Sequence, residues 1–408
     1  MKINIYSGNV KSAWYSLRAS RVRSFFTMLG VIIGITSVVT VVSLGTGLKH
    51  QLSGQINRLG PDVLSVRSGQ INASNTSSLT TLSLLGISSI TPADVTTLGK
   101  VPQLKAVAPF DFVTNTVTKN GTRLGNVFVI GTTPDLASVA KLDPRFGNFL
   151  SGDTDSQNVA VLGSSVALKL FNELNPVGES FNVDGQPFTV YGVLPQSPGG
   201  LLSVAQTDFN SSVFIPFSTA QRLNAGHADI LQVLVKAADS KKVNQAALAA
   251  QSALARSHPG ASFSVLTQKQ LADIANGVIN TATKFISAVA GISLLVGGIG
   301  IMDVMLVSVS ERTREIGLRK AVGATNRQVL NQFMIEGLVL SVGGGIIGIL
   351  ASLLVDLLLK LYTNWQPVLD WPILVVAAIV SVDVGIVFSA VPAIKAAAKN
   401  PIEALRSE

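Results

Sequence analysis

The chain has 408 residues, of which 47% are apolar and 13% charged, whereas soluble domains average about 25% charged residues. This balance excludes an ordinary soluble protein, and the length allows two or three domains. Cysteine is absent, which excludes disulfide frameworks, cysteine zinc sites and thiol nucleophiles. The formal net charge of +8 must be interpreted from the positions of the basic residues.

The first element in chain order is the N-terminal segment, residues 1–23. Apolar side chains between Tyr6 and Leu17 recur on one helical face, and Trp14 suits the headgroup region of a membrane. We expect an amphipathic helix over 6–20 that lies on the inner leaflet and braces the first span. The alternative is a plain cytoplasmic extension.

Four long, almost uncharged runs predict membrane spans, because a helix needs about 20 residues to cross the hydrocarbon core. The predicted spans are residues 24–47, 283–309, 327–358 and 372–394. The first run exceeds the core of a signal peptide, which is about 7–15 residues, and no small-residue cleavage site follows it. The predicted fold class is therefore a membrane protein with four transmembrane α-helices.

The region between the first two spans, residues 48–282, is the only sizeable polar part of the chain. Helix-compatible sequence continues beyond the first span until Gly60 and Pro61, where it ends. Thr267 to Gln270 is a capping box that begins a helix leading into the second span. We expect these two helices to form a stalk carrying a large extracytoplasmic domain.

This domain is predicted to be mixed α/β. Alternation of apolar and polar residues predicts strands over 62–67, 112–118, 126–130, 159–162, 188–194, 231–236 and 262–266. Helix starts are predicted near Thr91, Ser218 and Asp239. The last two strands enclose a helix over 240–257, which is the order of a βαβ-like unit.

Basic residues concentrate in residues 1–23, in the segment 311–328 and in the tail, 395–408. The positive-inside rule places these segments, and so both termini, in the cytoplasm. Residues 48–282 and the short loop 359–371 then face outward. The excess charge is a topology signal, so we expect membrane lipids and no nucleic acid as partners. The expected location is the inner, or cytoplasmic, membrane, crossed several times.

Acidic residues inside spans are candidates for function. At 1.5 Å per residue, Asp303 and Glu336 lie roughly 12–14 Å inside the cytoplasmic end. Asp356 precedes Lys360 by one helical turn, which a snorkelling ion pair would explain. Asp383 lies midway along the last span, where we expect a protonated carboxyl hydrogen-bonded between helices. The alternative for these acids is a proton or substrate pathway.

Signatures of catalysis are missing from the sequence. It has no P-loop, no H-E-x-x-H and no G-x-S-x-G motif, and its histidines, His50, His227 and His258, are scattered. We expect solvated histidines, no catalytic residue, no metal site and no enzyme activity in this chain. Four spans and one polar domain without such a site suggest a component that moves, powered from elsewhere.

A short charged helix is predicted over 311–323, within the loop 310–326. Glu315 precedes Arg319 by one turn, the favourable order for an ion pair, and Gly323 is a natural stop. Thr325 to Gln328 is a capping box for the third span. A positive-inside loop needs only scattered basic residues. A capped helix with apolar residues instead favours docking into a groove on a cytoplasmic partner.

Six side chains of this helix are expected to make that contact. Ile316 and Leu318 would enter the groove, and Arg314, Glu315, Arg319 and Lys320 would fix the orientation.

The sequence resembles the MacB/FtsX-like family of ABC transporter permeases. The most specific signature is GIMDVMLVSVSERTREIGLRKAVGA, residues 300–324. The similarity continues at Arg23–Gly34, at Pro392–Arg406 and in the outer domain at Val161–Phe171 and Asn175–Gly178. It covers essentially the whole chain.

The resemblance implies a porter-like outer domain, a second permease copy (identical or different) and a separate cytoplasmic ABC ATPase. It also implies that 311–323 is the coupling helix on which the ATPase docks. ATP and Mg²⁺ would belong to that partner, so no cofactor is expected in this chain, which lacks the ATPase domain fused in longer members. The expected function is a permease that converts ATP hydrolysis into motion of the outer domain for efflux or export.

Two other functions stay open. The chain could be an FtsX-type regulator that transmits motion to an external cell-wall enzyme, or a permease of a lipoprotein-extracting machine. An extracytoplasmic adaptor protein would accompany the export function.

Small residues indicate where helices meet. Gly30 and Gly34 form a small-xxx-small pattern in the first span, and Gly297 and Gly298 lie in the second. We expect these glycines in helix packing and, partly from the resemblance, spans one and two at the dimer interface.

Overall fold

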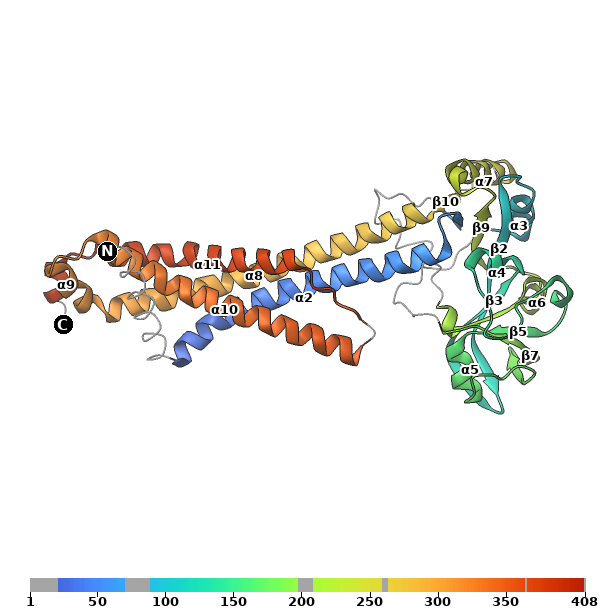
Figure 1. Ribbon diagram of the computed structural model, residues 1–408, viewed down its shortest axis with the longest axis horizontal. Coiled ribbons are helices and arrows are strands. Elements are labelled where there is room, and N and C mark those ends of the chain that lie inside the picture. The colour runs from blue at the N-terminus through green and yellow to red at the C-terminus, as the bar shows by residue number, and fades with distance from the viewer. Residues whose placement is uncertain (1–20, 70–88, 197–207, 259–262, 364, 407–408) are drawn as a thin grey trace. The chain divides into compact units, whose positions relative to one another are not determined.

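A computed structural model describes residues 21–69, 89–196, 208–258, 263–363 and 365–406. The predicted amphipathic helix over 6–20 lies outside these residues. The chain divides into two units, one made of residues 1–48 and 279–408 and the other of residues 49–278. Figure 1 shows the helices of the first unit and the strands of the second.

Within the described residues, four helices are long and apolar enough to cross a membrane, which confirms the four predicted spans. They belong to α2 (Arg21–Leu59), α8 (Gln268–Glu311), α10 (Asn326–Tyr362) and α11 (Trp371–Ala398). α2 and α8 are unbroken helices that run past the predicted ends of their spans, as expected. The capping boxes that begin α8 and α10 are both present, with Thr267 bonded to Gln270 and Thr325 to Gln328.

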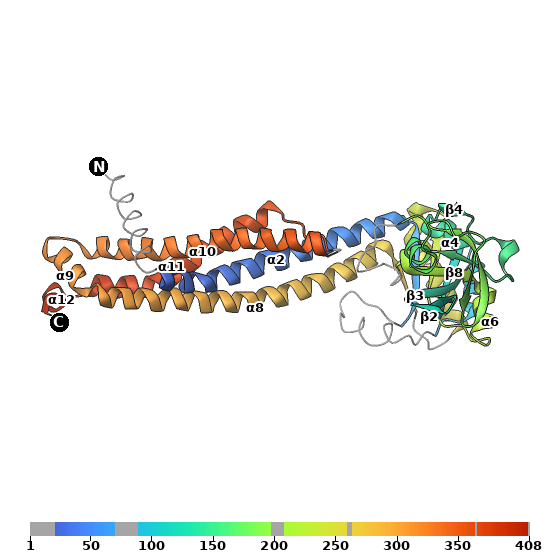
Figure 2. The ribbon, with the colours of Figure 1, turned by 90° about the horizontal axis from the view of Figure 1, so that it is seen from below.

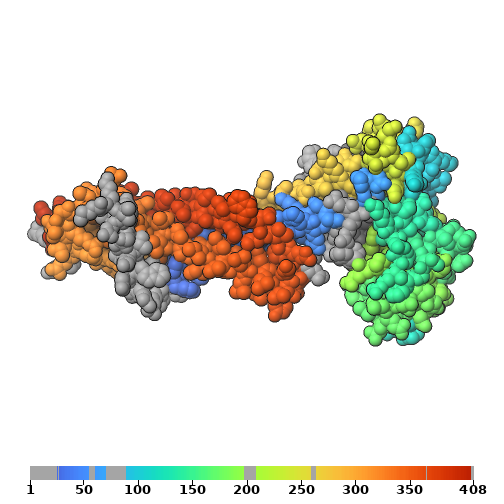
Figure 3. All heavy atoms as spheres, viewed as in Figure 1, coloured from blue at the N-terminus to red at the C-terminus, as the bar shows by residue number. Residues whose placement is uncertain are grey.

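Close backbone contacts hold these helices side by side (Figure 2). A β-carbon on Gly30 of α2 would lie 2.4 Å from the Cα of Gly297 on α8. Between α10 and α11, the Ser341 hydroxyl donates to the Ser381 carbonyl at 2.5 Å, and the Ser381 hydroxyl donates back at 2.8 Å. Small residues thus set the packing distance, as is usual in membranes. Side chains of α10 and α11 form much of the face of this unit visible in Figure 3.

Short helices complete the first unit. α9 (Thr313–Ala321) links α8 to α10, and α12 (Pro401–Arg406) follows α11.

The second unit is a mixed α/β domain, as predicted. Its strands are β1 (Val63–Ser68), β2 (Leu104–Lys119), β3 (Thr122–Thr132), β4 (Phe146–Gly147), β5 (Val159–Leu162), β6 (Ser180–Val183), β7 (Gln186–Val193), β8 (Ser212–Pro216), β9 (Ile230–Ala237) and β10 (Phe263–Thr267). Its helices are α3 (Pro92–Gly99), α4 (Asp135–Ala140), α5 (Ser164–Phe171), α6 (Phe217–Leu223) and α7 (Val243–Ser257), with short 3-10 turns η2 (Gly152–Thr154), η3 (Phe209–Ser211) and η4 (Ser240–Lys242).

The seven predicted strands are confirmed, but β4, β6, β8 and the first half of β2 were not predicted. Helices α4 and α5 were also missed. Most of these elements are short, and the buried β8 lacks the alternation of exposed and buried residues that marks a half-exposed strand.

The predicted βαβ-like unit, β9–α7–β10, needs one correction. β1 lies between β9 and β10 and is antiparallel to both, so the two parallel strands are not neighbours. β2 continues this part of the sheet on the other side of β9.

The second half of β2 belongs to a ring of strands. It pairs with β3, and the pairings of β3, β8, β5, β7 and β6 lead back to β2 through Thr118 and Asn182. β2 therefore joins the two parts of the domain.

Asp111 lies at this junction and is fully buried. Its Oδ1 accepts hydrogen bonds from the Asp229 backbone N–H at 2.7 Å and the Asn224 side chain at 3.4 Å. Burial, with a smaller contribution from the Asp229 charge, raises the pKa of Asp111 to about 7.

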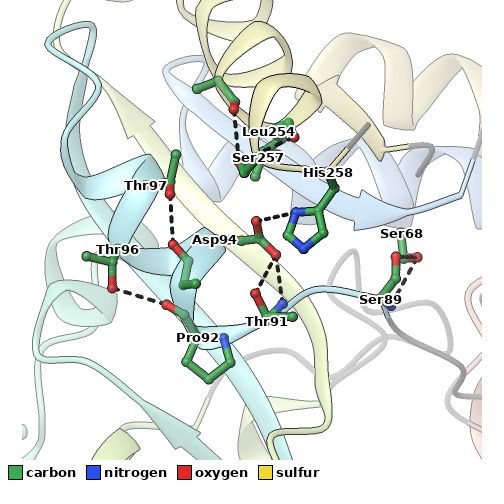
Figure 4. A network of polar contacts seen from close by, with 12 residues as sticks. Ser68, Ser89, Thr91, Pro92, Asp94, Thr96, Thr97, Leu254, Ser257 and His258 are labelled. Carbon is green, nitrogen blue, oxygen red and sulfur yellow. Dashed lines mark hydrogen bonds and ion pairs between the residues drawn. The ribbon is translucent and has the colours of Figure 1, made fainter. Parts of the chain in front are cut away.

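A buried carboxylate also ties α3 to α7 (Figure 4). Asp94 accepts from the backbone N–H and the hydroxyl of Thr91, each at 2.8 Å, which confirms the predicted helix start. On its other side, Oδ1 of Asp94 lies 3.0 Å from Nδ1 of His258 at the end of α7. The prediction of a merely solvated His258 is therefore wrong.

Candidate functional site

Helix α9 is the main candidate from the sequence, and its C-terminal end is built as predicted. α9 ends at Ala321, and Gly323 follows with φ +108°. The Gly323 N–H donates to the Lys320 carbonyl, and the Ala324 N–H donates to the Arg319 carbonyl, both at 3.0 Å. This is the Schellman arrangement, which needs a left-handed residue after the helix and explains the glycine.

One face of α9 packs against its own chain. Ile316 is only 2% exposed and belongs to the apolar core of the first unit. A β-carbon on Gly317 would lie 2.7 Å from the β-carbon of Ala404, so α12 packs directly on α9. The prediction that Ile316 enters a partner's groove is therefore wrong, because that side chain is already buried.

Lys320 also acts within the chain. Its ammonium group donates to the carbonyls of Ala397 at 2.6 Å and Lys399 at 2.8 Å. These carbonyls lie at the C-terminal end of α11, where a cation satisfies unpaired acceptors and the helix dipole. Lys320 therefore anchors α9 to the end of α11.

A polar chain links α9 to α10. Glu315 and Arg319 form the predicted ion pair at 2.5 Å, and Arg319 also donates to Gln332 of α10 at 2.6 Å. At the α8–α9 junction, Arg312 lies 3.4 Å from Glu336. Glu336 is 6% exposed, so this predicted intramembrane acid has a cationic partner that sequence reasoning missed.

The opposite face of α9 is open. Arg314, Leu318 and Val322 recur at successive helical turns and so lie on one face. Leu318 is 58% exposed and Val322 is 84% exposed. Arg314 is exposed and makes no ion pair or side-chain hydrogen bond with the described residues. We call Arg314, Leu318 and Val322 the α9 outer stripe.

Helix α12 carries an exposed apolar side chain that the sequence analysis did not single out. Ile402 of α12 is 75% exposed. The Asn400 side chain accepts from the Ile402 N–H at 3.2 Å, and Pro401 is the first helical residue. Asn followed by Pro is a helix-start signal, so this small helix was within reach of sequence reasoning.

The four predicted glycines pack inside the chain. Gly30 meets Gly297, and a β-carbon on Gly34 would lie 3.0 Å from Leu294. A β-carbon on Gly298 would lie 2.3 Å from the Phe388 ring of α11. The expectation of helix packing is met, but these contacts join α2, α8 and α11 of one chain. A dimer interface at spans one and two stays a prediction.

Two predicted intramembrane acids lie on the outside of the first unit. Asp303 of α8 and Asp383 of α11 are both exposed. Asp383 makes no hydrogen bond with the described residues, so the interhelical hydrogen bond expected for it is not found among them. The described residues contain no group of three or more His, Cys, Asp or Glu suited to a metal ion.

Two family models cover most of the chain. Residues 24–253 match a MacB-like periplasmic core domain, and residues 287–401 match an FtsX-like permease C-terminal domain.

Curated relatives match over nearly the whole chain. The macrolide export ATP-binding/permease protein MacB of Bdellovibrio bacteriovorus is 32% identical over 98% of this chain. The uncharacterized ABC transporter permease YknZ of Bacillus subtilis is 33% identical, also over 98%. The chain spans 62% of the length of that MacB and 99% of YknZ.

One solved structure with some likeness is the periplasmic region of MacB from Actinobacillus actinomycetemcomitans. It is 20% identical with a TM-score of 0.44, over 54% of this chain and 94% of that chain.

Proposed function

Since the chain belongs to the MacB/FtsX-like family of ABC transporter permeases, we propose that it is the permease of an export system driven by a separate ATPase. The observation that carries this proposal is the α9 outer stripe. α9 is fixed to its own chain on one face through Ile316, Gly317 and Lys320, and it presents two apolar side chains and a free cation on the other. A force that the ATPase applies to such a helix would be transmitted to α8, α10 and α11.

The energetics favour the apolar part of the stripe as the docking element. Burying a Leu-sized side chain in a partner's groove contributes roughly 1.5–3 kcal/mol. An exposed ion pair contributes about 1 kcal/mol or less. Leu318 and Val322 would therefore dominate affinity, and Arg314 would orient the partner.

The proposed setting follows from the basic residues. Both termini and α9 lie in the cytoplasm, and the chain crosses the cytoplasmic membrane, with residues 49–278 outside. ATP and Mg²⁺ are held by the ATPase. A second permease copy completes the transporter, and an extracytoplasmic adaptor can bind the outer domain.

The proposed cargo is an exported small molecule of unassigned identity. Relatives are named for macrolide export and for pyoverdine export. These names support efflux over a regulatory or lipoprotein-extracting role, but they do not select one substrate.

The test is affinity purification of the tagged chain from its own membranes. We expect an ABC ATPase to co-purify and its ATP hydrolysis to depend on the permease. Leu318→Ala combined with Val322→Ala should reduce both its recovery and its stimulation by about ten-fold or more. The matched control is Leu248→Ala on α7, another exposed leucine at 64% exposure, which should change neither. Normal ATPase recovery and stimulation with the double variant would disprove docking on α9.

A further inference from the structure

A buried acid in α10 forms no ion pair with the residues that the structure describes. Asp356 is 8% exposed, and neither carboxyl oxygen makes a hydrogen bond. Lys360, one turn further along, is exposed and forms no ion pair with Asp356. The snorkelling pair predicted from the sequence is therefore wrong. A buried carboxylate requires compensation by a cation, by hydrogen bonds or by a proton.

Other unsatisfied oxygens come from α2, the helix next to Asp356. The hydroxyl of Ser43 lies beside the Asp356 carboxyl group. The Ser43 and Thr40 hydroxyl oxygens are both buried without a hydrogen-bond partner. Thr40 precedes Ser43 by about one helical turn, so the two hydroxyls share one face of α2.

The register of the two helices brings Ser43 and Asp356 to one level, with Thr40 about one helical turn before it. The Thr36 hydroxyl donates to the Gly348 carbonyl at 3.0 Å, which fixes α2 against α10. Contacts of Gly344 with Val31 and of Gly348 with Ile35 show that the two helices run in the same direction. Ser43 and Asp356 each lie two turns beyond the Thr36–Gly348 contact, about 10–12 Å along the helix axis.

The backbone at Ser43 is held from the other side. The Val368 N–H, in the segment before α11, donates to the Ser43 carbonyl at 3.1 Å. This contact occupies the carbonyl and leaves the hydroxyl as the available group of Ser43.

We propose that Asp356, Ser43 and Thr40 form a binding site for a monovalent alkali cation between α2 and α10. Four buried oxygen atoms, two from a carboxylate and two from hydroxyls, suit a hard cation, which prefers oxygen ligands. One carboxylate balances a single positive charge, whereas a divalent ion would leave an uncompensated charge in a buried place. The site lies between two helices that also meet at Gly344, at Gly348 and through the Thr36 hydroxyl.

The experiment is thermal unfolding of the full chain in detergent at constant pH and ionic strength. LiCl, NaCl and KCl are each exchanged against N-methylglucamine chloride. A ligand that binds only the folded state raises the melting temperature with its concentration. We expect one alkali cation to raise it by several degrees in a saturable manner.

Single substitutions test which residues bind the cation. Asp356→Asn should abolish the cation response. Ser43→Ala should weaken the apparent cation affinity roughly ten-fold, because it removes one ligand to a charged group. Asp383→Asn is the matched control, since it removes an exposed acid from the same unit and should leave the response intact.

Three results would overturn the proposal. They are an equal cation response in the unchanged chain and in Asp356→Asn, an unchanged affinity in Ser43→Ala, and a melting temperature that depends on pH but on no alkali cation. The last would identify Asp356 as a buried carboxylic acid. If Asp356→Asn does not accumulate, Ser43→Ala decides, and full cation affinity in that variant would refute the site.

Discussion

The contact between Gly30 and Gly297 predicts that α2 and α8 cannot keep their distance if either glycine is replaced by a larger residue. A β-carbon on Gly297 would lie 2.5 Å from the carbonyl carbon of Gly30 and 2.7 Å from the nitrogen of Val31. Both atoms belong to backbone, so no side chain can swing aside. Ordinary contact begins near 3.4 Å, and α2 and α8 must therefore separate by about 1 Å to admit Gly297→Ala.

The magnitude follows from two opposing terms. Overpacking of this kind costs about 1–3 kcal/mol. Replacing a helical glycine by alanine contributes about 1 kcal/mol in the other direction. Gly291 and Gly300 of the same helix have open space where a β-carbon would be, so Gly291→Ala and Gly300→Ala gain the second term without the first. The predicted difference between Gly297→Ala and these controls is about 1–3 kcal/mol.

The assay is thermal unfolding of the purified full chain in detergent. We expect Gly297→Ala to melt several degrees below both controls. Equal melting temperatures for Gly297→Ala and Gly300→Ala would refute the argument that this backbone contact sets the α2–α8 distance.

Three further predictions follow. Ile316→Ala should destabilise the chain by roughly 2–4 kcal/mol in the same assay, because it leaves a cavity in the core, whereas Leu318→Ala should change stability by less than about 0.5 kcal/mol; equal effects would contradict the assignment of the two faces of α9. The pKa of Asp111 is raised above its unfolded value to about 7, so the folded state binds a proton more tightly, and its stability should fall as pH rises from about 4 to about 7; hydrogen exchange of β2 and β9 amides should show this trend and lose it in Asp111→Asn. Because the chain has no cysteine, Ser252→Cys should react with an impermeant maleimide on intact spheroplasts and Arg314→Cys should react only after lysis; labelling of position 314 from outside would refute the proposed orientation.

The sequence alone determined the features that depend on neighbouring residues. The four spans follow from the length of the uncharged runs, because any helix that crosses a bilayer needs about 20 mostly apolar residues. The capping boxes at Thr267, Thr325 and Thr91 were recognisable because a cap and its partner are three residues apart. Gly323 was also recognisable as the end of α9, because a glycine directly after a helix is a local signal. Strands with one exposed face, such as β7, show alternation and were found.

Only the tertiary structure decided which strands and helices meet. No local signal places β1 between β9 and β10, because the pairing partners lie far apart in the chain. The same holds for the closure of the strand ring through β6 and for the role of Asp111 at its junction.

The two faces of α9 show the same limit at the candidate site. Ile316 and Leu318 are both apolar and are two residues apart, so the sequence predicted that both would enter a partner's groove. The apolar core of the first unit buries Ile316 and the end of α11 binds Lys320, while Leu318 stays exposed.

Asp356 shows the same limit of sequence-based prediction within a membrane span. Lys360 is its neighbour along the helix, and helical spacing alone suggested an ion pair. Packing decides otherwise, because it buries Asp356 beside Ser43 of α2 and leaves Lys360 exposed. Helical spacing fixes which residues can share a face, but only packing determines whether that face is buried.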